Sequence, residues 1–126
     1  MELSQYFKSI LQQDPEPVVI CDLSHTILYM NPAACREYRR FGGEALLGKD
    51  LLVCHNSHSQ AAIKRVLAYF AENSAHNRIH TFFSEKENKD VYMVALRDEA
   101  GALIGYYEKH ECRTQDLTPL YEGVMK

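Results

Sequence analysis

The 126-residue sequence lacks the features that would mark a membrane protein or a nucleic-acid-binding protein. No apolar run approaches the roughly 20 residues that a membrane-spanning helix needs. The first residues do not combine a basic stretch with an apolar one, so they do not resemble a signal peptide. Lys and Arg number 14 against 17 Asp and Glu, a net charge of −3, and no basic stripe is present. We therefore expect a cytoplasmic protein that contacts neither membrane nor nucleic acid.

The common motifs for metals and nucleotides are also missing. None of the four cysteines belongs to a C-x-x-C pair, so no zinc knuckle is predicted, and cytoplasmic thiols stay reduced. Neither G-x-x-x-x-G-K-[ST] nor G-x-G-x-x-G, the loops that cradle phosphates, occurs in the chain. With 46% hydrophobic and 25% charged residues, the composition is that of a globular domain rather than a disordered chain.

What is present is a helix followed by a strand hairpin. Residues 3–13 carry apolar side chains at helical spacing, and the Pro-containing stretch 14–17 ends that helix. Two strand-forming stretches, 18–21 and 26–30, flank a short turn and predict a hairpin.

Two further helices are predicted in the middle of the chain. Asn31-Pro32 suits the cap and the first position of a helix that runs to about residue 40. The clearest element is a helix over residues 58–73, for which Ser57 and Gln60 predict a capping box. Its apolar residues fall on one stripe that should face the core: Ile63, Val66, Leu67 and Phe70.

The last third of the chain predicts three strands, at about 77–84, 90–97 and 102–112, with a tight turn at Asp98-Glu99-Ala100-Gly101. Sequential strands joined by short loops pair antiparallel. The fold class is therefore α+β, with a five-stranded antiparallel sheet covered on one face by helices.

Three stretches of the chain resemble a PAS domain. The first is 14–34, with its opening hairpin and Asn31-Pro32-Ala33; the second is Glu44–Leu51, with Leu-Gly-Lys; the third is Val94–Gly105, with Arg-Asp-x-x-Gly. The segment Cys54-His55-Asn56-x-x-Ser59 is similar to a Cys-His-x-x-x-Ser segment of a bacterial PAS subfamily. The expected division is an N-terminal helix (1–13), a PAS domain (14–113) and a C-terminal tail (114–126).

This resemblance implies a sensory protein rather than an enzyme. A small ligand would bind between the long helix and the sheet, and the signal would pass through protein–protein contacts to a downstream signalling protein, because no output domain is present. The strand at 90–97 could turn either of its two faces toward this pocket. The expected ligand-binding residues are Ser59, Ile63, Val66, Leu67, Phe70, Met93, Tyr92 and His55.

Two alternatives remain open. One is a ligand-free interaction module whose aromatic side chains fill the pocket. The other is a haem or metal sensor that uses Cys54, His55 or His58, although helical geometry turns His58 about 130° from the apolar stripe. Catalysis would require an acidic residue or a histidine in the pocket, and no acidic residue lies on a clear inward stripe.

The N-terminal helix is the expected dimer interface. Its apolar residues form one stripe that no other predicted element covers, and we expect it to pack on a second copy of the chain. The stripe consists of Leu3, Tyr6, Phe7, Ile10 and Leu11.

Overall fold

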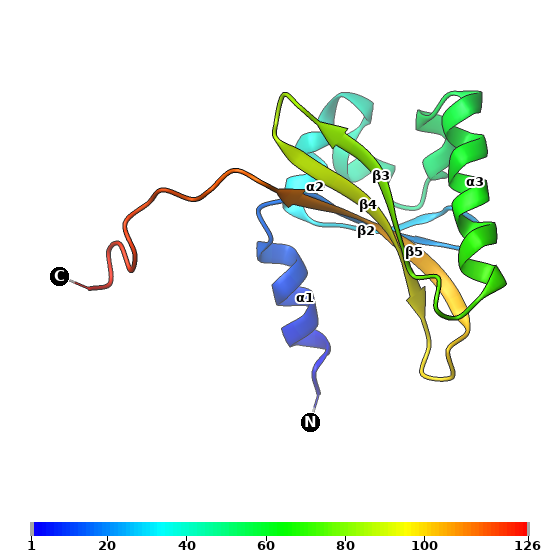
Figure 1. Ribbon diagram of the computed structural model, residues 1–126, viewed down its shortest axis with the longest axis horizontal. Helices are drawn as coiled ribbons and strands as arrows, with labels where there is room; N and C mark the ends of the chain where they lie inside the picture. Colours follow the sequence, from blue (N-terminus) through cyan, green and yellow to red (C-terminus); the bar gives the residue numbers. More distant parts are fainter. Residues whose placement is uncertain (1, 126) are drawn as a thin grey trace.

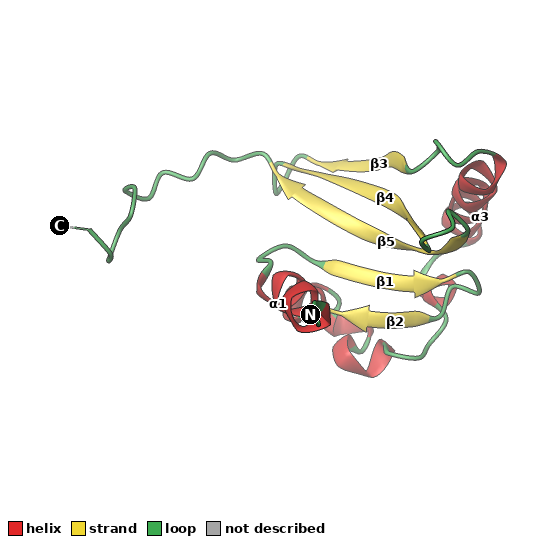
Figure 2. Cartoon of the chain, turned by 90° about the horizontal axis from the view of Figure 1, so that it is seen from below, coloured by secondary structure: helices red, strands yellow, loops and turns green. Residues whose placement is uncertain are grey.

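A five-stranded antiparallel sheet forms the centre of the protein, whose computed structural model describes residues 2–125. Seen in Figure 2, the strands follow the order β2-β1-β5-β4-β3, so the first hairpin lies beside the last strand of the chain. The predicted fold class is confirmed. The strands are β1 (Val18–Asp22), β2 (Ile27–Met30), β3 (Arg78–Ser84), β4 (Lys89–Arg97) and β5 (Leu103–Cys112).

The helices that cover the sheet lie between β2 and β3 in the chain. They are α2 (Pro32–Glu37), three short 3-10 turns, η1 (Arg39–Phe41), η2 (Gly43–Leu46) and η3 (Leu51–Cys54), and the long helix α3 (Ser57–Glu72). The helix expected to reach residue 40 becomes 3-10 after Glu37, and two glycines with positive φ, Gly42 and Gly43, follow it. None of the helices within residues 2–125 is long and apolar enough to cross a membrane.

Asn31 joins three parts of the fold. Its side-chain oxygen accepts hydrogen bonds from the backbone amides of Val18 and Ala34, each at 2.9 Å, so it caps α2 and anchors β1 together. Its amide nitrogen donates to the carbonyls of Leu11 and Glu16, at 3.0 and 2.9 Å. A fully buried Asn whose bonds are satisfied therefore fixes the linker from the first helix to the sheet.

The contact between the two halves of the sheet requires a glycine. β1 pairs with β5, and Gly105 lies opposite Asp22. A Cβ atom at Gly105 would lie only 2.2 Å from the carbonyl oxygen of Cys21, so no other residue fits without movement of the backbone. The predicted tight turn before it is also present, because Gly101 adopts a φ of +88° and its amide bonds the carbonyl of Asp98.

The predicted capping box of the long helix is wrong. The cap of α3 is Asn56, whose side chain accepts a hydrogen bond from the amide of Ser59 at 2.9 Å, and Ser57 is the first residue inside the helix. Gln60 turns to the preceding segment instead and donates to the carbonyls of Leu52 and His55, both at 2.9 Å. Asn and Ser are equally good caps, so the sequence alone did not separate these neighbours.

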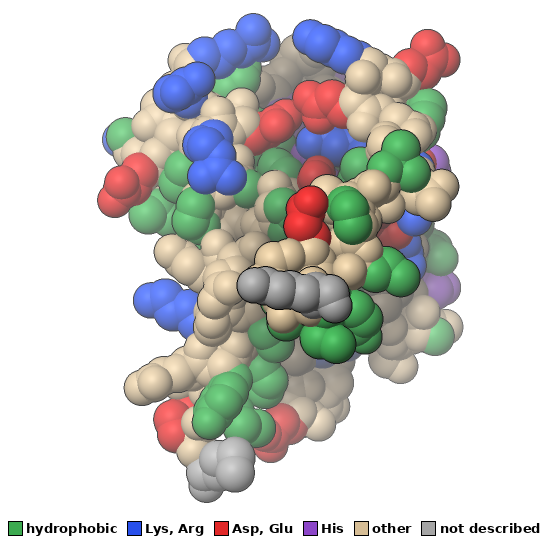
Figure 3. Space-filling view, turned by 90° about the vertical axis from the view of Figure 1, so that its left-hand side faces the viewer, with side chains coloured by type: hydrophobic (Ala, Val, Ile, Leu, Met, Phe, Trp, Pro, Cys, Tyr) green, Lys and Arg blue, Asp and Glu red, His purple; other side chains and the backbone are tan. Residues whose placement is uncertain are grey.

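The N-terminal helix and the C-terminal segment lie away from the core. The strands run between α1 (Ser4–Gln13) and α3, and the chain after β5 extends outward (Figure 1). No side chain of α1 is buried. Figure 3 shows exposed hydrophobic side chains on the side of the molecule that lies to the left in Figure 1. In α1, Tyr6, Phe7 and Ile10 are 59–69% exposed, and Leu3, just before the helix, is 42% exposed.

Candidate functional site

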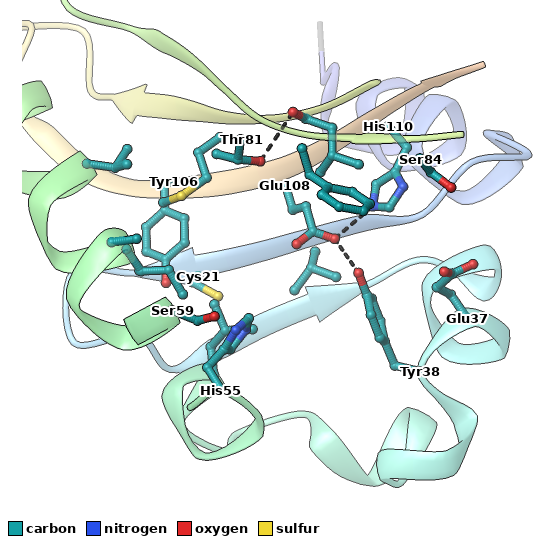
Figure 4. Close-up of a pocket in the computed structure, with 18 of the residues that line it drawn as sticks. Cys21, Glu37, Tyr38, His55, Ser59, Thr81, Ser84, Tyr106, Glu108 and His110 are labelled. Carbon is teal, nitrogen blue, oxygen red and sulfur yellow. Dashed lines mark hydrogen bonds and ion pairs between the residues drawn. The ribbon is translucent and has the colours of Figure 1, made fainter. Parts of the chain in front are cut away.

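A cavity of about 520 Å³ lies between α3, the 3-10 turns and the sheet. The first half of α3 forms one wall, and β1, β4 and β5 form the opposite one (Figure 4). This volume is within the range of small-molecule sites. The side that is open to solvent is marked by the exposed residues of its lining: Glu37, His58, Ala62, Thr81, Phe82 and Glu87.

One end of the cavity is apolar. Ile63 and Val66 of α3 face Val91 and Met93 of β4 across it, with Val19 of β1 beside them. Alternate residues of a strand point to one face, so the face of β4 that carries residues 89, 91 and 93 is the one turned toward the cavity. The choice between the two faces, which the sequence left open, is thereby decided.

The other end holds three polar side chains, two of which form hydrogen bonds to the third. The His110 ring nitrogen Nε2 lies 2.7 Å from Oε1 of Glu108, and the Tyr38 hydroxyl donates to the same oxygen (Figure 4). Glu108 and His110 share one face of β5, and Tyr38 comes from the turn after α2. The strand and the helical block therefore meet at a single carboxylate oxygen.

The His110 side chain is only 5% exposed, and its second ring nitrogen has no partner. Within residues 2–125, His110 Nδ1 is the one buried side-chain nitrogen or oxygen without a hydrogen bond. Burying such an atom unpaired costs about 1–3 kcal/mol. The cavity that His110 lines offers the space in which a partner atom could be placed.

The electrostatics of this end keep Glu108 ionised. Burial alone would raise the pKa of the Glu108 carboxyl, but the hydrogen bonds from His110 and Tyr38 outweigh burial and lower the pKa below its ordinary value. The pKa of Tyr38 is raised, by burial and by the negative charge of Glu108. Tyr38 therefore stays a protonated donor.

Tyr106, which also lines the cavity, forms a second polar pair with His25. The Tyr106 hydroxyl lies 2.9 Å from His25 Nδ1, and burial raises its pKa. Burial also raises the pKa of the neighbouring Cys21 thiol to about 12. This thiol is therefore a packing residue rather than a nucleophile, since only the thiolate is reactive.

A buried lysine lies beside the polar end. Lys89 is 7% exposed at its side chain, and its Nζ lies 2.8 Å from Glu87, 3.6 Å from Glu16 and 3.9 Å from Glu37. Burial would lower its pKa, but the hydrogen bond to Glu87 and the charges of Glu37 and Glu16 raise it. Lys89, Glu37 and Glu87 also line a second, smaller cavity of about 320 Å³, so they separate the two spaces.

Five of the eight residues expected to bind a ligand line the large cavity, and three do not. His55, Ser59, Ile63, Val66 and Met93 are in its lining. Phe70 is fully buried and packs into the core, with Leu67 against it. Tyr92 lies on the opposite face of β4, where Arg78 lies 3.9 Å over its ring. Placing Tyr92 and Met93 in one pocket was wrong, because neighbours on a strand point to opposite faces.

The candidate metal residues are separated. Cys54 packs against the hydrophobic core, whereas His55 and His58 line the cavity. His58 is exposed, as its direction away from the apolar stripe predicted, and it also lines the open side of the cavity at the start of α3. No group of three His, Cys, Asp or Glu side chains within residues 2–125 is arranged to hold a metal ion.

Sequence reasoning missed the three polar residues at the end of the cavity. It found no acidic residue on an inward stripe, yet Glu108 is on one. For Glu108 and His110 the available signal was their alternation with Tyr106, which places these residues on one face of β5. Charged residues on the other face, Lys109 and Glu111, hid this alternation.

Comparison with known proteins identifies the family. A family model for the PAS fold matches residues 11–116, so the chain belongs to the PAS-fold family. PAS domains are typically sensory, non-catalytic modules. Among curated proteins, none matches the sequence.

Solved structures agree on the fold. A C-terminal domain from Streptococcus mutans is 23% identical, with a TM-score of 0.65 over 94% of this chain and 87% of that one. The PAS domain of a Colwellia psychrerythraea protein is 13% identical, with a TM-score of 0.66 over 88% and 97%. The Aer2 receptor of Vibrio cholerae, described as a dual PAS-haem oxygen sensor, is 18% identical, with a TM-score of 0.54 over 78% and 94%. The chain thus has the fold of a PAS sensor domain.

Proposed function

We propose that this PAS domain senses a small molecule that binds in the cavity between α3 and the sheet. The observation that carries the proposal is the buried His110 Nδ1, which lines a cavity of about 520 Å³ and has no partner within the described chain. A buried polar atom of this kind usually has a protein, water or ligand partner. An occupant that pairs with it would remove that cost and gain affinity.

The connections of the site suggest how binding would be transmitted. Tyr38 and Glu108 join the helical block to β5, and β5 leads directly into the C-terminal segment. β1, which forms part of the cavity wall, is tied through Asn31 to the end of α1. A ligand that favours one arrangement of these parts shifts the population toward it, and α1 and the C-terminal segment would present the change to a partner protein.

The first experiment is native mass spectrometry of the purified chain, which detects a co-purified ligand. Ala62→Phe introduces a ring into the cavity, whereas Ala61→Phe adds the same ring at an exposed neighbour that does not line it. Loss of the bound mass in the first variant and its retention in the second would support the proposal. Absence of any bound mass, with no stabilisation by a metabolite collection, would favour a ligand-free interaction module instead.

We also propose that the protein is a homodimer and that α1 forms the interface. The apolar side chains of its stripe are exposed and lie together on one face, and exposed apolar patches of this kind mark interaction sites. Ile10→Glu would place a charge in this stripe and should convert the dimer to a monomer in analytical ultracentrifugation. Ser9→Glu places the same charge elsewhere on the helix and should leave the dimer intact. An unchanged mass for Ile10→Glu would refute this interface.

A haem sensor is the second candidate, because His55 and His58 line the cavity and one structural relative is described as a haem sensor. Three carboxylates line the same cavity, at Glu37, Glu87 and Glu108, against one lysine. Acidic groups repel the two propionates of haem, so the site fits this group poorly. The visible absorption spectrum of the purified protein would show a haem directly.

A further inference from the structure

We infer that the occupant of the cavity is an organic amine, bound in its protonated form with its ammonium group at the Glu108–His110 end. This inference rests on the proposed function, because it names the chemical class of the ligand for the same site. It follows from three features of the cavity: the acceptors that lack a partner, the balance of charge, and the position of the apolar wall.

The acceptors come first. The Glu108 carboxylate takes a hydrogen from His110 Nε2, at 2.7 Å, and another from Tyr38. We take His110 as a neutral imidazole whose single hydrogen lies on Nε2, facing the carboxylate, and this assignment leaves the buried, unpartnered Nδ1 as an acceptor. Both bonds to Glu108 end on one oxygen, and Figure 4 shows the other oxygen directed toward the side where Ser59 lies. The cavity therefore offers two acceptors without a hydrogen-bond donor, His110 Nδ1 and the second carboxylate oxygen of Glu108.

The balance of charge selects a cation among donors. Glu37, Glu87 and Glu108 oppose a single lysine in the lining. That lysine is already engaged, since Lys89 Nζ lies within 3.9 Å of Glu16, Glu37 and Glu87. It consequently offers no free positive charge to an anionic ligand. The remaining negative charge attracts an ammonium group and repels a carboxylate or a phosphate.

The apolar wall of the cavity determines the chemical character of the rest of the ligand. Ile63, Val66 and Met93 lie on the same cavity as the polar end, so the molecule needs an apolar body attached to the amine. A primary ammonium has three hydrogens to donate, which suits the two free acceptors. Charge-assisted hydrogen bonds of this kind are roughly twice as strong as neutral ones.

The test compares three probes of similar shape on the full chain: 2-phenylethylamine, 2-phenylethanol and 3-phenylpropanoate. Dissociation constants come from NMR titration, followed at the methyl groups of Ile63, Val66 and Met93. We expect the amine to bind at least about tenfold more tightly than the other two, which corresponds to one charge-assisted bond. The comparison uses the unmodified protein, so it does not depend on whether a variant folds.

A pair of variants then locates the amine. Glu108→Gln removes the charge at the site and should abolish the preference for the amine over the alcohol. Glu111→Gln removes the same charge from the same strand on its opposite face, where Glu111 pairs with Arg113 at 2.9 Å, and should keep the preference.

The outcomes separate this inference from the proposed function. If the alcohol or the carboxylate shifts the same methyl groups at equal or lower concentration, the amine class is wrong while a ligand-binding cavity stands. An amine preference that survives Glu108→Gln would also overturn the inference. If no probe moves these methyl groups, the amine class is wrong, and native mass spectrometry without a bound mass would then refute ligand sensing itself.

Discussion

The space beneath α3 is closed at one end and open at the other. At the closed end Phe70 is fully buried, and the guanidinium of Arg97 donates to the carbonyls of Phe70, Asn73 and His76 at 2.7, 3.2 and 3.2 Å. At the open end His58, Ser59 and Ala62 stand over the cavity. The C-terminal half of this helix therefore packs into the core, and its N-terminal half forms a wall of the cavity.

This difference shows how one helix can combine rigidity with adaptability. A long amphipathic stripe is normally buried along its whole length, but here the Arg97 bonds hold one end against the β4–β5 hairpin. The other end is held by a cap and by Gln60. The second half of α3 has more buried contacts than the first half, so we expect its backbone to open less readily, because the local stability of a segment follows from its buried contacts.

The largest effect is expected at the closed end. Phe70→Ala removes a fully buried ring and should lower the free energy of unfolding by about 3–5 kcal/mol. Val66→Ala, on the same helix but half-buried at the cavity, should cost only about 1 kcal/mol. Urea denaturation followed by circular dichroism measures both. Equal losses would show that the two halves of α3 do not differ as described.

Arg97 is the next largest test. Arg97→Gln removes its bonds to the end of α3 and to Gly101, which should cost about 2 kcal/mol. Hydrogen exchange should rise in residues 66–77 and change little at the start of α3. Arg65→Gln, on the exposed side of the same helix, should stay within about 0.5 kcal/mol of the unchanged protein. Uniform exchange along α3 in Arg97→Gln would contradict a fixed end.

The polar residue Glu108 of the cavity should make the free energy of unfolding depend on pH. Because the folded protein lowers the pKa of Glu108, this group contributes stability above its unfolded pKa of about 4.3, and that stability is lost as pH falls through the lower folded pKa. Glu108→Gln should therefore flatten the loss of stability between pH 5 and the acid limit, whereas Tyr38→Phe, which removes one donor, should flatten it partly. An acid limb in Glu108→Gln as steep as in the unchanged protein would exclude this role.

The same contrast explains how much could be predicted from the sequence. At the closed end the sequence patterns predicted the structure, since Phe70 is on the apolar stripe and the turn at Asp98–Gly101 is present. The resemblance to the PAS family is also confirmed. The open end breaks the rule that inward positions are apolar, since Glu108 and His110 point to the cavity. Such departures are typical of functional sites.

Two features of the open end need the folded chain and cannot be read from local patterns. The partner of Glu108, Tyr38, is 70 residues away and comes to it only through the packing of the helical block on β5. The face of β4 that lines the cavity depends on the register in which Met93 lies opposite Glu108. In an alternating strand with polar residues on both faces, a shift of one residue would exchange the two faces.

The smallest expected effect concerns the first turn of α3, where the open end begins. Asn56 caps the helix through the amide of Ser59, so Asn56→Ala should lower the free energy of unfolding by about 1 kcal/mol. Ser57→Ala, which the sequence pattern would make equally harmful, should have almost no effect, because Ser57 lies inside the helix. If Asn56→Ala also weakens ligand binding while Phe70 stays protected from exchange, the cap holds the cavity wall without support from the closed end. An equal loss in both variants would contradict the assignment of Asn56 as the cap of α3.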